Sequence, residues 1–328
     1  MSRPRILLAA ENAARFGDAL QDEFDVVRLW TLNSDAEVRT QACDVRAVVA
    51  SGNMPIRRTV LEALPNLGLV ACVGSGYEQI DMMYLRGRCV PVTHAPGLNS
   101  RDVAEFAVAG ALAQVSNLIA YDRFVRDGGW ERGERIPTRR ALRTLHAGVL
   151  GLGSIGALVA ARMAALGMAV SWWGPHPKPE VPYPRQESLL ALAKASDILF
   201  VTARADASNE KLIDAKTMDA VGPEGVIVNV SRGTILDEDA LVSALNSGAL
   251  GGAVIDTFWT EPAPAARWAA TPNLLLSPHA ASATRDSSQA LFDHLRENLR
   301  RFFTGKPLMT LAPGSAPQRV DGPKIQGA

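Results

Sequence analysis

Three glycines in the middle of the chain constrain its fold more than any other feature. Gly151, Gly153 and Gly156 lie in the stretch GVLGLGSIG, which follows an apolar strand and opens an Ala-rich helix. In such a turn the first glycine permits a tight bend, the second lets a pyrophosphate approach the backbone, and the third lets the helix pack closely on the sheet. The N–H groups of Ser154 and Ile155 would then face the phosphates from the helix N-terminus. The pattern predicts a dinucleotide-binding unit.

Short runs rich in valine, isoleucine and leucine alternate with helical segments on both sides of these glycines. They read RILLAA, DVVRLW, VRAVVAS, LGLVACVG and CVPVTHA before residue 99, and they continue from HAGVLGLG to NLLLSPHA after residue 144. Continuous apolar runs of this kind are typical of parallel strands that are buried on both faces. We therefore expect an α/β fold with two Rossmann-like domains, each built on a parallel sheet.

The position of the glycine-rich turn indicates how these domains are connected. The turn begins near residue 148, after one complete α/β unit, so we expect a dinucleotide-binding domain inserted into another domain. Residues 1–98 and 287–312 would form a flavodoxin-like substrate domain, and residues 99–286 an NAD(P)-binding Rossmann domain. A cleft between two such units is a natural small-molecule site. The Gly- and Pro-rich segment 313–328 is predicted to be a disordered tail.

The composition argues against several other classes of protein. Thirty-four Lys and Arg residues balance 34 Asp and Glu residues, so no overall charge attracts nucleic acid or an anionic membrane. Cys43, Cys72 and Cys89 are isolated, which favours reduced thiols, and no apolar run approaches the ~18 residues of a membrane span. The histidines lack ligand-like spacing. We expect a cytoplasmic protein without a metal, a nucleic-acid partner or a membrane partner.

Three polar residues follow apolar strands, at the position where open α/β sheets carry their ligands. Arg232 follows VIVNVS, Glu261 follows AVIDTFWT, and His279 follows LLLSP. Taken with the glycines, the motifs GLGSIG, NVSRG followed by DEDAL, DTFWTEP and SPHAA resemble those of the D-isomer-specific 2-hydroxyacid dehydrogenase family, over nearly the whole chain before the tail. The resemblance extends to the NADPH-dependent glyoxylate/hydroxypyruvate reductase branch.

This resemblance implies hydride transfer from NAD(P)H to a small 2-oxo acid such as glyoxylate or hydroxypyruvate, which gives the D-2-hydroxy acid. It assigns Arg232, Glu261 and His279 to the catalytic group. The residue chemistry agrees, because Arg232 offers a permanent charge and a forked pair of donors for the carboxylate or the ketone oxygen. His279 can protonate that oxygen as hydride reaches the carbon, and Glu261 would orient the imidazole and favour its protonated form.

The resemblance also implies further ligand contacts. The loop CVGSGYEQIDM is similar to the family loop whose amides receive the substrate carboxylate, so Gly74, Ser75 and Gly76 are expected to bind substrate together with Arg232 and His279. Asp256 is similar to the aspartate that bonds the nicotinamide carboxamide. The long helix and the loop after residue 99 are expected to build a homodimer, as in the family. The full set of expected cofactor contacts is Val103, Gly151, Gly153, Ser154, Ile155, Gly156, Trp173, Gly174, His176, Lys178, Val230, Ser231, Arg232, Asp256 and His279.

The strand AVSWW ends without the acid that usually grips the adenosine ribose. Gly174 stands near the position expected for this acid. A carboxylate there would repel a 2′-phosphate by roughly 4 kcal/mol at ~4 Å and an effective dielectric constant of ~20, and glycine removes that repulsion. His176 and Lys178 offer donors on a Pro-rich loop. We therefore expect NADP(H) in preference to NAD(H). The alternative is a solvated loop whose lysine contacts no ligand.

Two other functions stay open at the level of the sequence. A dinucleotide-sensing, corepressor-like binding protein would share this fold, and a dehydrogenase for a bulkier 2-oxo acid such as phenylpyruvate would share the catalytic group. The sequence does not show which of five residues contact the substrate, namely His94, Asn53, Met54, Trp130 and Trp259.

Overall fold

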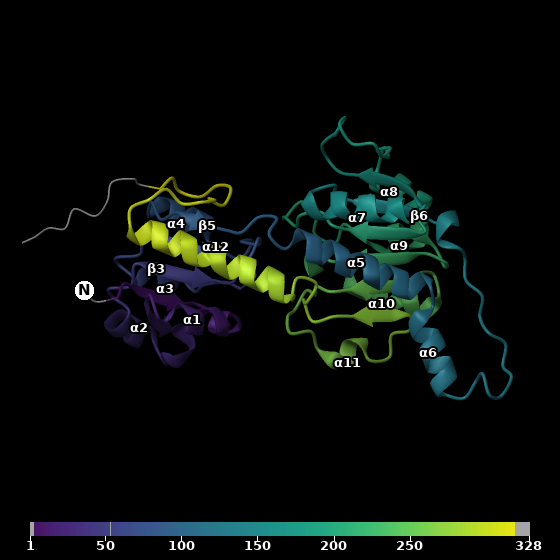
Figure 1. Cartoon of the computed structure of the whole chain (residues 1–328), viewed down its shortest axis with the longest axis horizontal. Helices are drawn as coiled ribbons and strands as arrows, with labels where there is room; N and C mark the ends of the chain where they lie inside the picture. The colour runs from purple at the N-terminus through teal and green to yellow at the C-terminus, as the bar shows by residue number, and fades with distance from the viewer. Residues whose placement is uncertain (1–2, 53, 319–328) are drawn as a thin grey trace, which may run out of the picture. The chain divides into compact units, whose positions relative to one another are not determined.

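The computed structural model describes residues 3–52 and 54–318 (Figure 1). The chain forms two compact units: unit 1 is Met1–Asn99 with Thr284–Ala328, and unit 2 is Ser100–Ala283. In the described part of the chain, each unit contains one sheet in which all strands run parallel. The expected α/β class with two parallel-sheet domains is therefore confirmed.

The sheet of unit 1 has the strand order β2-β1-β3-β4-β5, which is the order of flavodoxin-like folds. One face is covered by α2, α3 and α4, and the other by α1 and α12. The strands are β1 (Arg5–Leu8), β2 (Asp25–Arg28), β3 (Ala47–Ala50), β4 (Leu69–Cys72) and β5 (Val92–Thr93), and the helices are η1 (Glu11–Ala13), α1 (Ala14–Leu20), η2 (Leu29–Thr31), α2 (Asp35–Gln41), α3 (Arg58–Glu62), α4 (Met82–Gly87) and α12 (Arg285–Phe303).

The helix α12 returns the chain to unit 1. The Thr284 side chain accepts the N–H of Ser287 and so caps its first turn. Leu291, Leu295 and Leu299 follow at helical spacing and are all buried against the sheet, with charged residues on the opposite side. An amphipathic helix of this pattern can close an α/β layer although it is far from the other elements in the sequence.

Residues 313–318 pack on unit 1, so the expected disordered tail is wrong for this part of the chain. Leu311 forms an antiparallel bridge with Thr93, and the N–H of Val92 donates to the Ser315 hydroxyl at 2.8 Å. Ala316 is only 1% exposed. The segment covers β5, the edge strand of the sheet, whose backbone groups would otherwise lack partners on one side. The predicted tail residues 319–328 lie outside the described residues.

The sheet of unit 2 has the order β11-β10-β9-β8-β6-β7. Its strands coincide with the apolar runs of the sequence, and one face is covered by α5 and α7, the other by α8, α9 and α10. The strands are β6 (His146–Leu150), β7 (Ala169–Trp173), β8 (Ile198–Val201), β9 (Val226–Asn229), β10 (Gly252–Ile255) and β11 (Leu274–Leu276), and the helices are α5 (Ser100–Val115), α6 (Leu118–Arg126), η3 (Leu142–Thr144), α7 (Ser154–Ala165), α8 (Leu189–Ala195), α9 (Ala215–Val221), η4 (Gly233–Ile235), α10 (Glu238–Ser247) and α11 (Ala265–Trp268).

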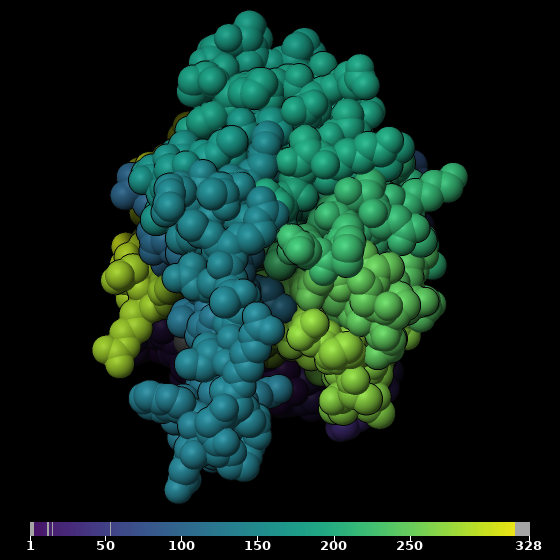
Figure 2. All heavy atoms as spheres, turned by 90° about the vertical axis from the view of Figure 1, so that its right-hand side faces the viewer, coloured from purple at the N-terminus to yellow at the C-terminus, as the bar shows by residue number. Residues whose placement is uncertain are grey.

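The long apolar segment after residue 99 forms two helices rather than one. Asn117 adopts a left-handed conformation with φ 53°, and the chain bends by 53° between α5 and α6. The helix α5 is buried on the sheet, whereas residues 118–140 project from unit 2 (Figures 1 and 2). No single helix in the described ranges is long and apolar enough to cross a membrane, although the bent pair passes that test by length and composition.

Candidate active site

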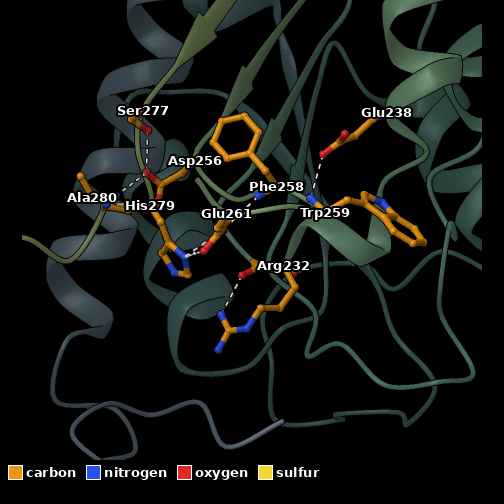
Figure 3. A network of polar contacts seen from close by, with 11 residues as sticks. Arg232, Glu238, Asp256, Phe258, Trp259, Glu261, Ser277, His279 and Ala280 are labelled. Carbon is orange, nitrogen blue, oxygen red and sulfur yellow. Dashed lines mark hydrogen bonds and ion pairs between the residues drawn. The ribbon is translucent and has the colours of Figure 1, made fainter. Parts of the chain in front are cut away.

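The carboxyl ends of β9, β10 and β11 are neighbours at one edge of the sheet in unit 2. Arg232 follows β9, Glu261 follows β10 and His279 follows β11. Figure 3 shows the three side chains gathered at this edge. Sequence reasoning named each of them from its own motif, and the parallel order of the strands brings them together.

One ring nitrogen of His279 contacts both carboxylate oxygens of Glu261. The Nδ1 atom of His279 lies 2.8 Å from Oε2 and 3.0 Å from Oε1 of Glu261. Because an ionised carboxylate only accepts hydrogen bonds, Nδ1 carries the proton of this contact, which leaves Nε2 for other chemistry. The two side chains are 31% and 29% exposed, so the pair is held by the protein and is still open to a small molecule.

The pKa of Glu261 is set by opposing influences. Burial is the largest of them and by itself raises the pKa. The hydrogen bond and charge of His279, the N–H of Phe258 and the charge of Arg232 outweigh burial and hold the pKa of the carboxyl below its ordinary 4.5. Glu261 is therefore ionised at neutral pH, as an orienting partner for imidazole requires.

The turn that carries His279 is held by Asp256. His279 has φ 51°, a left-handed backbone conformation that is uncommon for residues other than glycine. The buried carboxylate of Asp256 accepts the Ser277 hydroxyl at 2.6 Å and the N–H groups of Ala280 and Ala281 at 2.8 and 3.1 Å. Asp256 thus fixes the position of His279 from beneath. This role was not predicted, and the nicotinamide contact expected for Asp256 stays a prediction.

The loop that carries Glu261 is anchored at two further places. The N–H of Trp259 donates to Oε1 of Glu238 at 2.8 Å, and its indole Nε1 donates to the Leu236 carbonyl at 2.7 Å. A Cβ atom on Gly233 would lie 2.0 Å from the Phe258 carbonyl carbon, so only glycine permits this close approach. Sequence reasoning missed Glu238, although it lies in the quoted motif DEDAL.

Arg232 extends from a rigid strand end. Its backbone is extended, with φ −140° and ψ 147°, and its Nη1 donates to the Ser231 carbonyl at 2.8 Å. The Asn229 side chain accepts the Ser231 N–H and donates to the Arg232 carbonyl, both at 3.1 Å. These bonds fix the backbone from which the guanidinium projects.

The glycine-rich turn has the geometry that the sequence predicts for a pyrophosphate site. Gly151 has φ 86°, and a Cβ atom on Gly156 would lie 2.2 Å from the Gly151 carbonyl oxygen. A Cβ atom on Gly153, in contrast, would meet no described atom within 4 Å. The helix α7 begins at Ser154 without a side-chain cap, and the first N–H groups of a helix have no partner within it, so they are available to a ligand at this turn. The arrangement fits a dinucleotide.

Two buried hydroxyls at the strand ends also suit a ligand. Ser231 Oγ and Thr257 Oγ1 are buried, and neither has a hydrogen-bond partner within the described ranges. They follow β9 and β10, beside Arg232 and Asp256. Buried hydroxyls normally find a partner, which a bound cofactor or a water would supply here. Among the other expected cofactor contacts, Val103 on α5 and Val230 after β9 are buried and apolar.

The end of β7 is where the sequence places the adenosine ribose. Trp173 is the last residue of the strand, Gly174 is buried and His176 is exposed. Lys178 Nζ donates to the Leu152 carbonyl at 2.6 Å, so the lysine reaches over the glycine-rich turn. Arg185, which sequence reasoning did not name, donates to the Gly174 carbonyl at 2.7 Å. Its backbone bridges to Trp172 in parallel, which explains why it lies here.

The predicted substrate loop Gly74–Gly76 follows β4 in unit 1 and is half-buried. His94 Nδ1 lies 3.0 Å from the Ser75 carbonyl oxygen and its ring meets Tyr77 edge-on, so His94 supports this loop. Met54 and Trp130 are exposed, at 43% and 65%. Asn53 lies outside the described residues.

None of the described His, Cys, Asp and Glu residues form a group of three that could hold a metal ion.

Comparisons with known proteins show which family the chain resembles in sequence and in fold. The sequence profile of the D-isomer-specific 2-hydroxyacid dehydrogenase NAD-binding domain matches residues 108–281. The chain is 32% identical to a glyoxylate/hydroxypyruvate reductase of Arabidopsis thaliana and 33% identical to a hydroxyphenylpyruvate reductase of Plectranthus scutellarioides, in each case over 93% of this chain and 97% of the relative. It is similar to the structure of an NADPH-dependent glyoxylate/hydroxypyruvate reductase from Sinorhizobium meliloti, in complex with NADP and malonate, with a TM-score of 0.88 at 32% identity, over 97% of this chain and 99% of the other.

Proposed function

The chain belongs to the D-isomer-specific 2-hydroxyacid dehydrogenase family, and from that premise we propose which residues act and on what. It is an oxidoreductase that reduces a 2-oxo acid with NAD(P)H. We assign substrate binding to Arg232 and proton transfer to the His279–Glu261 pair. The observation that carries this assignment is the contact of His279 Nδ1 with Glu261 beside Arg232 at one sheet edge.

The proton step follows from the geometry of that pair. Glu261 holds Nδ1, so His279 delivers its proton from Nε2 to the ketone oxygen of the substrate. A nicotinamide dinucleotide held at the glycine-rich turn would supply the hydride that reduces the carbonyl carbon. Arg232 pairs with the substrate carboxylate and fixes the orientation of the ketone. The further carboxylate contact by the amides of Gly74–Gly76 rests on the sequence and on the small side chains of that loop.

The residues of the glycine-rich turn would hold the cofactor. The open space above Gly153 and the unused N–H groups of Ser154 and Ile155 suit a pyrophosphate. Three observations support a preference for NADP(H) over NAD(H): position 174 is not an acid, Arg185 lies at the Gly174 carbonyl, and Lys178 lies at the Leu152 carbonyl of the glycine-rich turn. The similarity to a reductase named as NADPH-dependent agrees with this preference.

The projecting segment 118–140 is proposed to bind a second copy of the chain. Leu118, Val125, Trp130 and Ile136 are each more than half exposed on it. Apolar side chains gathered in this way on a protruding segment are typical of a subunit interface.

The three free thiols, Cys43, Cys72 and Cys89, suit a reducing compartment, and we propose the cytoplasm.

A substrate panel tests the proposed function. Oxidation of NADPH and of NADH is followed at about 340 nm with glyoxylate, hydroxypyruvate, 2-ketogluconate and hydroxyphenylpyruvate, which span the range from small to bulky 2-oxo acids. We expect the highest kcat/KM with the small acids, and a fall of about 10³-fold in Arg232→Ala with a much smaller change in cofactor affinity. Folded, cofactor-saturated protein that turns over none of these acids would reject the assignment.

A further inference from the structure

We propose that Glu238 is a positioning residue for the acid–base pair, because its carboxylate holds the loop on which Glu261 stands. The inference rests on the roles proposed above for Glu261 and His279. It concerns a residue that touches neither of them. Glu238 lies at the start of α10, and it reaches the Glu261 loop through the N–H of Trp259 (Figure 3).

Glu238 is not used as a helix cap. The cap of α10 is Asp237, whose side chain accepts the N–H groups of Asp239 and Ala240. The neighbouring Glu238 is instead only 9% exposed, which is unusual for a glutamate in the first turn of a helix. A buried carboxylate is costly unless it is paired and hydrogen-bonded. Its contacts must therefore account for its position.

Both oxygens of Glu238 are engaged. Oε1 accepts the N–H of Trp259 at 2.8 Å, and Oε2 lies 3.2 Å from Nε of Arg267 on α11. Arg267 also pairs with Asp239 at 2.6 Å. One carboxylate oxygen of Glu238 thus accepts the N–H of the loop, and the other pairs with Arg267, which neutralises the charge of the glutamate.

The connection to the acid–base pair runs through two successive amides. The N–H of Trp259 is held by Glu238, and the N–H of the preceding Phe258 donates to Oε1 of Glu261 at 3.1 Å. That same Oε1 lies 3.0 Å from Nδ1 of His279. The two N–H groups belong to adjacent peptide planes that meet at the Cα atom of Phe258, so a displacement of Trp259 also displaces the donor that fixes the Glu261 carboxylate.

The charged groups around each carboxylate are distinct. Glu261 faces His279 and Arg232. Glu238 borders a cavity of about 250 Å³ whose other charged groups are Lys211, Asp237, Asp239 and Arg267. Lys211 is paired with Asp237 at 3.2 Å, so Arg267 is the cation that serves Glu238. Substitution of Glu238 therefore changes the loop anchor without removing a charge that faces Glu261.

Three variants test the proposal. Glu238→Ala removes the anchor, Glu238→Gln keeps an oxygen that can accept the Trp259 N–H, and Asp239→Asn is the control, because it removes the other carboxylate paired with Arg267. For each, kcat, KM and the pH dependence of kcat/KM are measured with the best substrate of the panel. We expect Glu238→Ala to lower kcat about tenfold with KM changed less than about threefold, on the scale of one lost orienting hydrogen bond.

The pH profile separates positioning from general stability. If the Phe258 N–H and His279 no longer hold Glu261, its carboxyl takes up a proton more readily, so the acid limb of kcat/KM moves to higher pH in Glu238→Ala by about half a unit or more. Glu238→Gln and Asp239→Asn should keep the wild-type limb. Should Glu238→Ala fail to fold, Glu238→Asp carries the test, since its shorter side chain keeps the charge but cannot span to Trp259.

The proposal is overturned if Glu238→Ala, or Glu238→Asp in its place, keeps the wild-type acid limb and kcat and differs only in melting temperature. It is also overturned if Glu238→Gln shifts the limb as much as Glu238→Ala. Turnover by wild-type protein and by Asp239→Asn is the separate check on the proposed function, so failure of that function shows in every sample and failure of this inference only in the Glu238 series.

Discussion

The carboxylate of Asp256 accepts the N–H of Ala280 at 2.8 Å, and this bond fixes the turn on which His279 stands. Asparagine at position 256 keeps one acceptor oxygen where the aspartate has two. At least one of the three donors then loses its partner, and we expect Asp256→Asn to lower the free energy of unfolding by about 1–3 kcal/mol and kcat by about tenfold or more. Urea unfolding and steady-state kinetics measure the two effects.

Ser277→Ala is the matched control for Asp256→Asn, because it removes a single hydrogen bond of the same carboxylate. It should cost about 1 kcal/mol and leave kcat within about threefold of the wild type. The NADPH dissociation constant, measured in parallel, tests the separate prediction that Asp256 contacts the nicotinamide. Wild-type kcat and stability in Asp256→Asn would contradict the positioning role.

The lowered pKa of Glu261 makes a prediction about stability against pH. As the pH falls through 4.5, the ordinary pKa of the carboxyl, Glu261 takes up a proton in the unfolded chain. In the folded protein it stays ionised to lower pH. The stabilisation is therefore fully present above that value and is lost as the pH falls through the lower folded pKa. We expect the melting temperature of the wild type to exceed that of Glu261→Gln by a constant amount from neutral pH down to pH ~5, and the difference to shrink below it. A difference independent of pH down to pH ~3 would contradict the coupling of Glu261 to His279.

Two glycines of the same turn should respond in opposite ways. Gly153→Ala adds a methyl group to open space, so the melting temperature should hardly change, whereas NADPH binding should weaken about tenfold because the pyrophosphate needs that space. Gly156→Ala places a methyl group 2.2 Å from the Gly151 carbonyl oxygen and should cost about 1–3 kcal/mol of stability. Calorimetry and cofactor titration distinguish the two. Equal losses of stability would show that the space at Gly153 is not open, and unchanged NADPH binding in Gly153→Ala would show that it is not a ligand site.

An acid at position 174 should reverse the proposed cofactor preference. A Cβ atom on Gly174 would lie 3.5 Å from the Trp172 ring, an ordinary contact, so aspartate can be accommodated there. Its charge would repel a 2′-phosphate by up to roughly 4 kcal/mol before screening. We expect the ratio of kcat/KM for NADPH to that for NADH to fall at least about tenfold in Gly174→Asp. Gly174→Ala is the control. A tenfold preference of the wild type for NADH would reject the NADP(H) proposal itself.

The proposed dimer can be broken on its apolar face. Leu118 and Val125 are exposed on α6 and lie seven residues apart, so they share one side of the helix. Glutamate at both positions should convert a dimer to a species of the 35.0 kDa chain mass, measured by light scattering. Met83→Glu, at a site 83% exposed on α4, is the control. A wild-type protein that already has the mass of one chain would contradict the proposal.

Much of the fold could be predicted because its signals are local. The apolar runs of β6 and β9 have the composition of strands buried on both faces, and the turn is specified by Gly151 and Gly156, which no other residue could replace without strain. Arg232, Glu261 and His279 could be named because each lies within a few residues after an apolar strand, in a set of motifs that resembles those of the family. Parallel order then places strand ends together.

The positions of the supporting residues could not be predicted in this way. Nothing local shows that Glu238 turns inward beside a capping aspartate, that Arg185 pairs with β7, or that Ala316 docks beside an edge strand. Each depends on a partner distant in the sequence, because a buried polar group is stable only where another element supplies its hydrogen bond. The sequence by itself therefore determined the two parallel sheets, the glycine-rich turn and the motifs that carry the side chains proposed to react. Only the tertiary structure decided which residues hold those side chains in place, since that depends on hydrogen bonds between segments that folding alone brings together.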